Sequence, residues 1–196
     1  MLHYFSLLSS PLRHQSHKLG GAIRAEDFMA LRYEVEKHFQ HISYSDTIDC
    51  LFCTRRNARW RKIENEDRIL SWLKKNFRTE IFEPEYLSME EQLRTLGKTK
   101  LFFGSGGSNP FSMFQPKDSV FFEIRPPVGS GIVGRSWSDL FRFGYHRIQT
   151  EFSKNETSSS EDYHQIDLVI NEEEFKKDVV TAAKLSGLFP DKVYQN

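Results

Sequence analysis

The sequence has little of three features that would otherwise define its class. It holds 2 cysteines in 196 residues, so disulfides cannot build its fold. Lysine plus arginine and aspartate plus glutamate both number 27, and a formal charge of zero argues against a dedicated nucleic-acid binder. No apolar run approaches the roughly 18 residues of a membrane-spanning helix. A globular domain with its own apolar core remains.

The two cysteines, Cys50 and Cys53, stand three apart within an apolar segment that predicts a buried strand over 47–54. Side chains three apart in a strand point to opposite faces, so we expect two free thiols. A second cysteine pair that could complete a zinc site is missing. His38 and His41, at the end of a predicted helix over 25–40, have no third ligand close by. We therefore predict no metal site.

Helical and strand-like segments alternate between residues 25 and 125. We predict helices over 25–40, 65–77 and 88–97, and strands over 47–54, 79–82, 100–103 and 119–124. Three of the strands are mostly apolar, which is typical of a parallel sheet covered on both faces. The pattern predicts an α/β fold with a doubly wound, mostly parallel, Rossmann-like sheet. We expect an irregular segment over 1–22 and one such domain over 23–190.

The remainder of the chain is more varied. We predict short helices over 110–114 and 137–143, a strand over 145–152, a mobile polar loop over 153–162 and a strand over 166–170. Asn171 is expected to cap a last helix that Gly187 ends. Its predicted buried stripe is Phe175, Val179, Ala182 and Leu185.

Two loops follow apolar strands where ligands bind in a doubly wound sheet. Residues 55–62 carry five basic side chains, and arginines beside a helix N-terminus suit a phosphate or diphosphate. Residues 104–109 are mostly glycine and serine, which lets backbone N–H groups approach an anion or a sugar. The alternatives are a solvated basic loop and an ordinary crossover loop. The acidic candidates Glu66, Asp67, Glu85 and Glu123 favour caps or surface charges over a catalytic base.

Four motifs in this order resemble glycosyltransferase family 61 over about residues 47–127. The first is Thr54-Arg55-x-x-Ala58-x-x-Arg61-x-Ile63-x-Asn65-Glu66, and the second is Glu85-Tyr86-Leu87-Ser88 followed by Gln92. The third is the segment from Leu101 to Phe114 with its glycine-rich loop, and the fourth is Ser119-Val120-Phe121-Phe122-Glu123-Ile124-Arg125-Pro126. A looser similarity reaches residue 185.

The resemblance implies the C-terminal, donor-binding half of a GT-B glycosyltransferase. Such an enzyme needs no metal or other cofactor and transfers a sugar with inversion from a nucleotide-sugar donor, here most simply a UDP-sugar, to a glycan or protein hydroxyl. By position, Arg55 and Arg61 would bind the donor diphosphate, and Asn65 and Glu66 would organise the helix start. The full set of donor-binding candidates is Arg55, Arg61, Asn65, Glu66, Gln92, Gly104, Ser105, Gly106, Gly107, Ser108 and Glu123.

Two departures from the family pattern favour an alternative. The histidine of the family's glycine loop is replaced by Gly106 or, in the other register, by Ser105. Residues 1–46 are too short for a second Rossmann-like half, so the partner half would come from a separate chain. The alternative is a non-catalytic, truncated or divergent relative that acts as a binding module. A nucleic-acid-associated protein using the arginines of 55–62 is a third interpretation, disfavoured by the zero charge. We expect a cytoplasmic or membrane-associated location without its own membrane helix, or the Golgi or ER lumen for a eukaryotic fragment.

Overall fold

The computed structural model describes residues 25–39, 47–105, 112–128, 138–139, 142–153 and 166–188. The chain divides into two units, Met1–His41 and Ile42–Asn196. In the first unit, helix α3 spans Ala25–His38, as predicted. The predicted segment 1–22, most of the loop over 153–162, and Gly106, Gly107 and Ser108 lie outside the described residues. The predicted helices over 110–114 and 137–143 are described only in part.

The second unit is built on a five-stranded sheet in which every pairing is parallel. Its strands are β1 (Ile48–Cys53), β2 (Thr79–Phe82), β3 (Thr99–Ser105), β4 (Val120–Ile124) and β5 (Gly144–Ile148). They lie in the order β2-β1-β3-β4-β5, which confirms the predicted Rossmann-like α/β fold. From β1 the chain goes outward to β2 and then returns to β3 on the other side. The order therefore reverses between β1 and β3, where doubly wound sheets bind their ligands.

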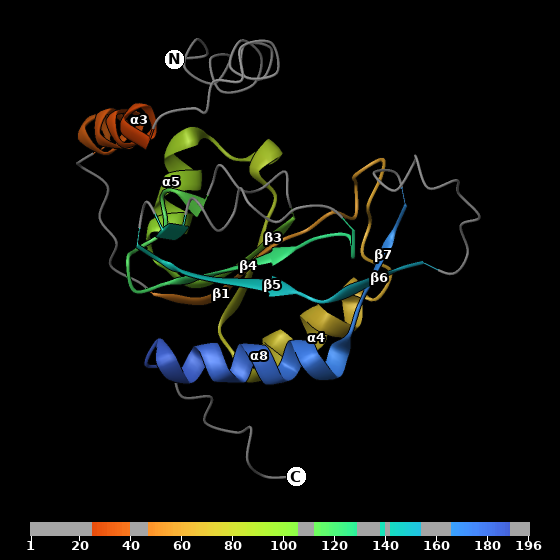
Figure 1. The fold of residues 1–196 in the computed structure, drawn as a ribbon. Helices are drawn as coiled ribbons and strands as arrows, with labels where there is room; N and C mark the ends of the chain where they lie inside the picture. Colours follow the sequence, from red (N-terminus) through yellow and green to blue (C-terminus); the bar gives the residue numbers. More distant parts are fainter. Residues whose placement is uncertain are drawn as a thin grey trace. The chain divides into compact units, whose positions relative to one another are not determined.

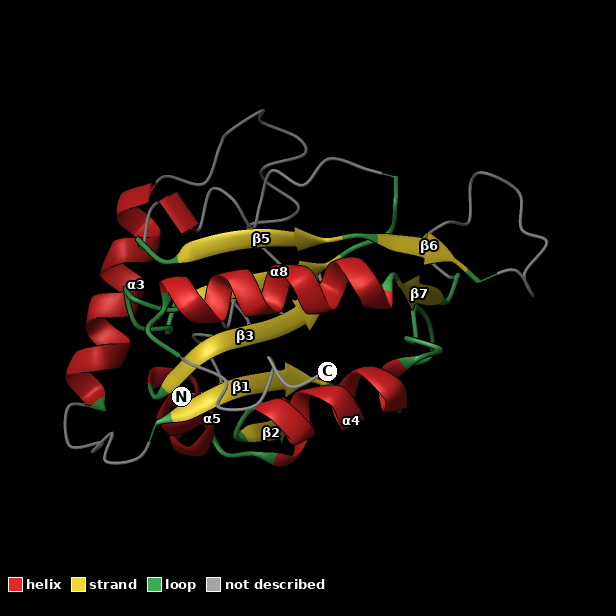
Figure 2. Ribbon diagram, turned by 90° about the horizontal axis from the view of Figure 1, so that it is seen from below, coloured by secondary structure: helices red, strands yellow, loops and turns green. Residues whose placement is uncertain are grey.

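Helices cover both faces of this sheet. Helices α4 (Glu66–Asn76) and α8 (Glu172–Leu185) lie on one face and α5 (Met89–Gly97) lies on the other (Figures 1 and 2). The helix boundaries follow local signals that the sequence carries. Ser88 and Glu91 form the predicted capping box of α5, and the Asn171 side chain accepts a hydrogen bond from the Glu174 N–H at the start of α8. Gly187, with φ +71°, adopts the left-handed conformation just after α8 ends.

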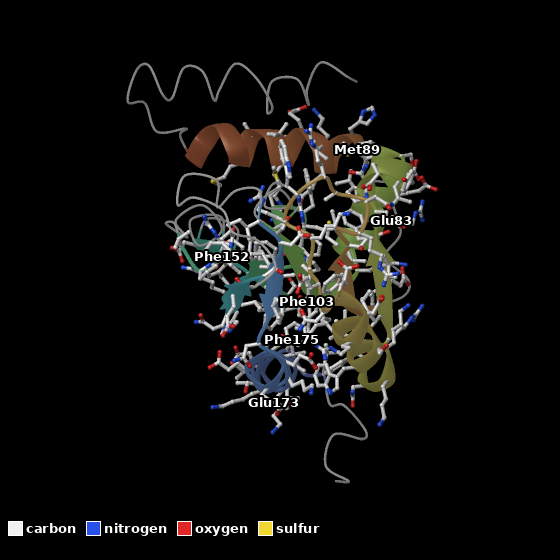
Figure 3. All side chains as sticks on the ribbon, turned by 90° about the vertical axis from the view of Figure 1, so that its right-hand side faces the viewer. Glu83, Met89, Phe103, Phe152, Glu173 and Phe175 are labelled. Carbon is white, nitrogen blue, oxygen red and sulfur yellow. The ribbon has the colours of Figure 1, made fainter. Side chains whose placement is uncertain are left out.

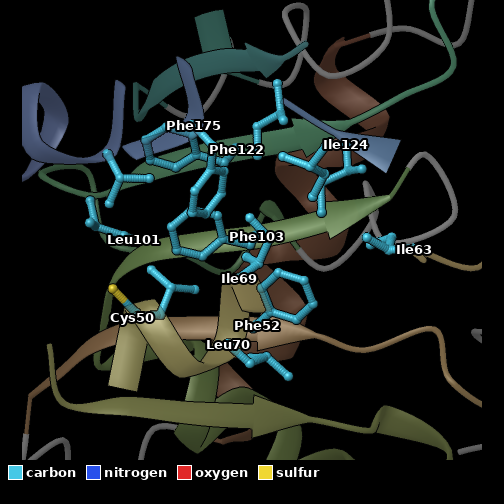
Figure 4. Packing of buried hydrophobic residues seen from close by; sticks show 14 of the residues in the cluster. Cys50, Phe52, Ile63, Ile69, Leu70, Leu101, Phe103, Phe122, Ile124 and Phe175 are labelled. Atoms are coloured by element: carbon cyan, nitrogen blue, oxygen red, sulfur yellow. The ribbon is translucent and has the colours of Figure 1, made fainter. Parts of the chain in front are cut away.

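The apolar core follows from strand alternation. Phe103 of β3 stacks with Phe52 of β1 and Phe122 of β4, at ring-centroid distances of 6.1 and 4.8 Å (Figure 4). Phe175 of α8 closes this face, with its ring centroid 5.5 Å from that of Phe103 (Figures 3 and 4). On the opposite face Phe102 stacks with Phe121 at 5.4 Å. The buried stripe of α4 contains the predicted Ile69, Leu70 and Leu73.

Cys50 and Cys53 are both buried and neither forms a disulfide, as predicted. Cys50 belongs to the cluster packed beneath α4 and α8. Because Cys53 is an odd number of residues further along β1, its side chain belongs to the other face. The two thiols thus serve as small core residues.

Two predictions in the C-terminal part were wrong. The single strand over 145–152 is in fact β5 followed by β6 (Thr150–Phe152), which pairs antiparallel with β7 (Leu168–Ile170) in a separate sheet. The chain leaves the main sheet at Gln149, whose carbonyl accepts a hydrogen bond from the Asn171 N–H. Leu185 was predicted to be buried, but it is 84% exposed. The last buried residue of α8 is Ala183, which lies on the face of the helix that packs against the sheet.

Candidate functional site

Glu66, the first residue of α4, organises the loop that follows β1. Its carboxylate is buried and accepts hydrogen bonds from the Thr54 hydroxyl at 2.5 Å and from the Arg55 backbone N–H at 3.1 Å. It also pairs with Arg56 Nε at 3.0 Å. A carboxylate at a helix N-terminus is stabilised by the helix dipole. The predicted role of Glu66 in shaping this helix start matches these contacts.

Arg55 bridges the two strands between which the sheet order reverses. Its guanidinium donates to the Ser105 hydroxyl at the end of β3, with Nη1 and Oγ 2.9 Å apart. Its Nε donates to the Arg61 carbonyl at 3.0 Å, and its Nη2 donates to the Trp60 carbonyl at 2.9 Å. These three bonds use three of the five guanidinium N–H groups. The structure thus brings Arg55, Arg61 and Ser105 together where the sheet order reverses, which joins the two loops that the sequence placed at this end of the sheet.

The charge of Arg55 has no carboxylate among these three partners. Burial lowers the pKa of Arg55, and the positive charge of Arg61 lowers it further. The neighbouring Arg56 is different, since it forms ion pairs with both Glu66 and Asp67. The guanidinium groups of Arg55 and Arg61 are half-buried and repel each other. A bound anion would stabilise both of them.

Arg61 has an unusual backbone and an unusual side chain. Its φ of +58° lies in the left-handed region, which non-glycine residues rarely adopt outside functional sites and tight turns. This residue presents its carbonyl to Arg55. Its side-chain Nε is buried and has no hydrogen-bond partner in the described part of the chain. A buried donor left without an acceptor costs free energy, which again favours an anion here.

Two further candidates bind the protein's own backbone. The Asn65 amide pairs with both backbone groups of Ile170, donating to the carbonyl at 2.8 Å and accepting from the N–H at 3.0 Å. Gln92 donates from Nε2 to the carbonyls of Pro84 and Leu87, at 2.8 and 3.0 Å. These amides hold the start of α4 and the loop after β2 in place. Direct contact of either one with a donor stays a prediction.

Glu123 lies near the carboxyl end of β4, and its contact with a donor stays a prediction. It is fully buried in β4, accepts a 2.5 Å hydrogen bond from the Tyr145 hydroxyl, and lies 3.6 Å from Arg125 Nη1. Burial, followed by the hydrogen bond and charge of Glu123, raises the pKa of Tyr145. Glu123 is in register with Gly104, one residue before Ser105, so alternation directs the Glu123 and Ser105 side chains to opposite faces. The contacts described for Glu123 do not join it to Arg55.

Sequence reasoning missed one acidic residue that contacts the basic loop. Asp167, just before β7, accepts a hydrogen bond from the Lys62 backbone N–H at 2.7 Å, and its negative charge raises the pKa of Arg55. Asp167 is separated from Lys62 by 105 residues, and no local pattern marks such a contact.

Within the described ranges, no group of three or more histidine, cysteine, aspartate or glutamate side chains could hold a metal ion. Every helix in those ranges is too short or too polar to cross a bilayer.

A parallel α/β sheet with arginines gathered at the reversal of strand order defines a domain suited to phosphate-bearing ligands. Residues 9–121, more than half of the chain, match the family model for Glycosyltransferase 61, and the chain belongs to that family. The match begins well before the four motifs and ends two residues before Glu123. No curated protein gives a match to this chain. Family membership supports glycosyl transfer as the general activity, with a sugar donor and an acceptor as substrates.

Proposed function

We propose that the chain binds a nucleotide-sugar donor between the ends of β1 and β3 and takes part in inverting transfer of the sugar. The observation that carries this proposal is the bridge from Arg55 to Ser105 across the reversal of strand order. The bridge fixes a half-buried guanidinium through neutral oxygens and leaves its charge for a ligand. A nucleoside diphosphate supplies the matching anion, and UDP is our first choice of nucleotide.

The proposed roles follow from the chemistry of the step. The bond between the sugar C1 and the diphosphate oxygen breaks, and a bond from C1 to the acceptor oxygen forms on the opposite face. Negative charge develops on the departing diphosphate, where Arg55 and Arg61 stabilise it electrostatically without a metal. The acceptor hydroxyl passes its proton to a base, which we do not assign to any described residue. We place the base with the acceptor-binding part of the enzyme.

A donor-binding protein that does not transfer sugar is the second candidate. One observation favours it: Ser105, which replaces the family's histidine in one register, has its hydroxyl occupied as the acceptor for Arg55. A serine hydroxyl bonded in this way cannot exchange a proton near neutral pH as an imidazole does. Binding would survive this replacement, whereas the rate of transfer would fall.

Calorimetric titration with UDP, GDP, CDP and the matching nucleotide sugars tests the proposal. We expect one nucleotide to bind saturably. Arg55→Ala should weaken it by about 1.5–3 kcal/mol, or roughly 10- to 150-fold, the scale of hydrogen bonds to a charged group. Arg59→Ala is the matched control, because Arg59 is exposed and stacks over Trp60, with 4.6 Å between its guanidinium carbon and the ring centroid. A thermal melt of each variant separates lost binding from lost folding.

Three outcomes are informative. Loss of affinity in Arg55→Ala but not in Arg59→Ala supports the site. Absence of binding by folded wild-type protein contradicts the proposal. If binding occurs, release of the nucleoside diphosphate from a nucleotide sugar shows that the chain is an enzyme. If no nucleoside diphosphate is released with any acceptor of a panel, the chain is a binding module.

A further inference from the structure

The segment between the basic loop and α4 is attached to the small C-terminal sheet. The Leu168 N–H donates to the Lys62 carbonyl at 2.8 Å, and the Glu64 N–H donates to the Leu168 carbonyl at 2.9 Å. Ile63 forms a parallel bridge with Leu168. The Asn65 amide then pairs with the backbone of Ile170. Residues 62–65 therefore run along β7 like an added strand.

Asp167 holds the first peptide of this added strand. Its Oδ1 accepts the Lys62 N–H at 2.7 Å, and this N–H belongs to the peptide whose carbonyl is that of Arg61. The same Arg61 carbonyl receives the Nε of Arg55 at 3.0 Å. One peptide thus connects the carboxylate of Asp167 to the guanidinium of Arg55. The contact also anchors the left-handed turn at Arg61, which has φ +58°.

The carboxylate of Asp167 has a second, opposing effect. Its negative charge attracts Arg55, whereas the charge of Arg61 repels it. No direct ion pair joins Asp167 to Arg55 among the described contacts, so its carboxylate acts on Arg55 through space. A negative charge near two guanidinium groups weakens the attraction that they exert on an anionic ligand.

We propose that Asp167 is a positioning residue of the diphosphate site: its oxygen fixes the peptide between Arg61 and Lys62, while its charge limits how tightly the diphosphate binds. This inference rests on the proposed function and adds a residue beyond the family match, which ends at residue 121. The C-terminal segment around β7 is then part of the donor site and not only a support for α8.

Two substitutions separate the two effects. Asp167→Asn keeps an acceptor oxygen for the Lys62 N–H and removes the charge. We expect it to bind pyrophosphate and the preferred nucleotide about two- to fivefold more tightly at low salt, and this gain should shrink as added salt screens the charge. Asp167→Ala removes both. We expect it to bind about tenfold more weakly than Asp167→Asn, because the turn at Arg61 loses its anchor.

The control pair is Asp49→Asn and Asp49→Ala. Asp49 makes the same type of contact at the opposite edge of the sheet, where its Oδ2 accepts the Arg78 backbone N–H at 2.9 Å. These variants should leave the affinity unchanged. A purely structural role of Asp167 would not produce tighter binding in the asparagine variant, so the sign of that change is the decisive result.

Isothermal titration with inorganic pyrophosphate and with nucleotides, alongside thermal melts, gives distinct outcomes. Tighter binding by Asp167→Asn and weaker binding by Asp167→Ala support the inference. If both variants bind as wild type does, or both weaken in step with a lower melting temperature, the inference is wrong and the donor site stands. If the wild-type protein binds pyrophosphate but binds none of the nucleotides, and the Asp167 variants still change pyrophosphate affinity as expected, only the proposed function is contradicted. No binding of either probe overturns both.

Discussion

Charged residues have different partners at the two ends of the strands in the main sheet, which we call the amino edge and the carboxyl edge. At the amino edge, Asp49 accepts the Arg78 backbone N–H, and Lys100 forms an ion pair with Asp118. At the carboxyl edge, the guanidinium of Arg55 donates to three neutral oxygens, so none of these partners neutralises its charge. What distinguishes the carboxyl edge is a held guanidinium without a carboxylate partner, which is the property that an anion site requires.

The largest expected effect concerns the organiser of the carboxyl edge. Glu66→Ala removes the buried acceptor of Thr54, Arg55 and Arg56. We expect the free energy of unfolding to fall by about 3 kcal/mol, because the Thr54 hydroxyl and the Arg55 N–H lose hydrogen bonds to a buried charged group. Urea unfolding measures it, with Asp118→Ala as the amino-edge control. Equal losses in the two variants would show that the edges do not differ in this way.

The second prediction concerns the buried carboxylate of β4. Tyr145→Phe removes the hydroxyl that donates to Glu123 and should cost about 1–2 kcal/mol of unfolding free energy. The pKa of Tyr145 is raised in the folded state, so its contribution is complete below the ordinary tyrosine pKa of about 10 and is lost as the pH rises above that value.

Urea unfolding near neutral pH and at alkaline pH checks both parts. Wild-type protein should lose stability at alkaline pH faster than Tyr145→Phe. Parallel curves for the two proteins would mean that the Tyr145 hydroxyl does not support Glu123.

The smallest effect is expected at the amino edge. Lys100 and Asp118 form an ion pair in which Asp118 is largely exposed, so Asp118→Asn should cost less than about 1 kcal/mol and salt should reduce the cost. The Lys100 hydrogen bond lowers the pKa of Asp118. The pair therefore stabilises the fold above the ordinary aspartate pKa of about 3.9 and loses this effect as the pH falls through the lowered value. The free energy of unfolding of Asp118→Asn should therefore fall less steeply with decreasing pH than that of the wild type. A steeper fall would contradict a stabilising Lys100–Asp118 pair.

Local patterns were sufficient to predict much of the fold. The period of α4, the apolar run of β1 and the capping box at Ser88 each depend on residues a few positions apart. The break at Gln149 was missed because a one-residue change of sheet leaves the apolar alternation on either side intact. Leu185 was misplaced because a helical stripe read from sequence does not show where the covering surface ends.

The site was predictable to a smaller extent. Parallel topology alone implied that the loops after β1 and β3 share an edge, and Arg55 and Ser105 do meet there. Which arginine side chain pairs with carboxylates was not predictable, since Arg55 and Arg56 are adjacent and only the folded structure assigns the carboxylates of Glu66 and Asp67 to Arg56. The Asp167 contact depends on a backbone N–H more than a hundred residues away, which no motif records.

The most direct test compares Arg55→Ala with Arg78→Ala in the same nucleotide titration. Each variant removes one positive charge, the first at the carboxyl edge and the second at the amino edge, where Arg78 is exposed. The account predicts that Arg55→Ala weakens UDP or the preferred nucleotide at least tenfold, while Arg78→Ala stays within about twofold of wild type. Equal weakening in both variants, or none in Arg55→Ala, would contradict a diphosphate site at the carboxyl edge.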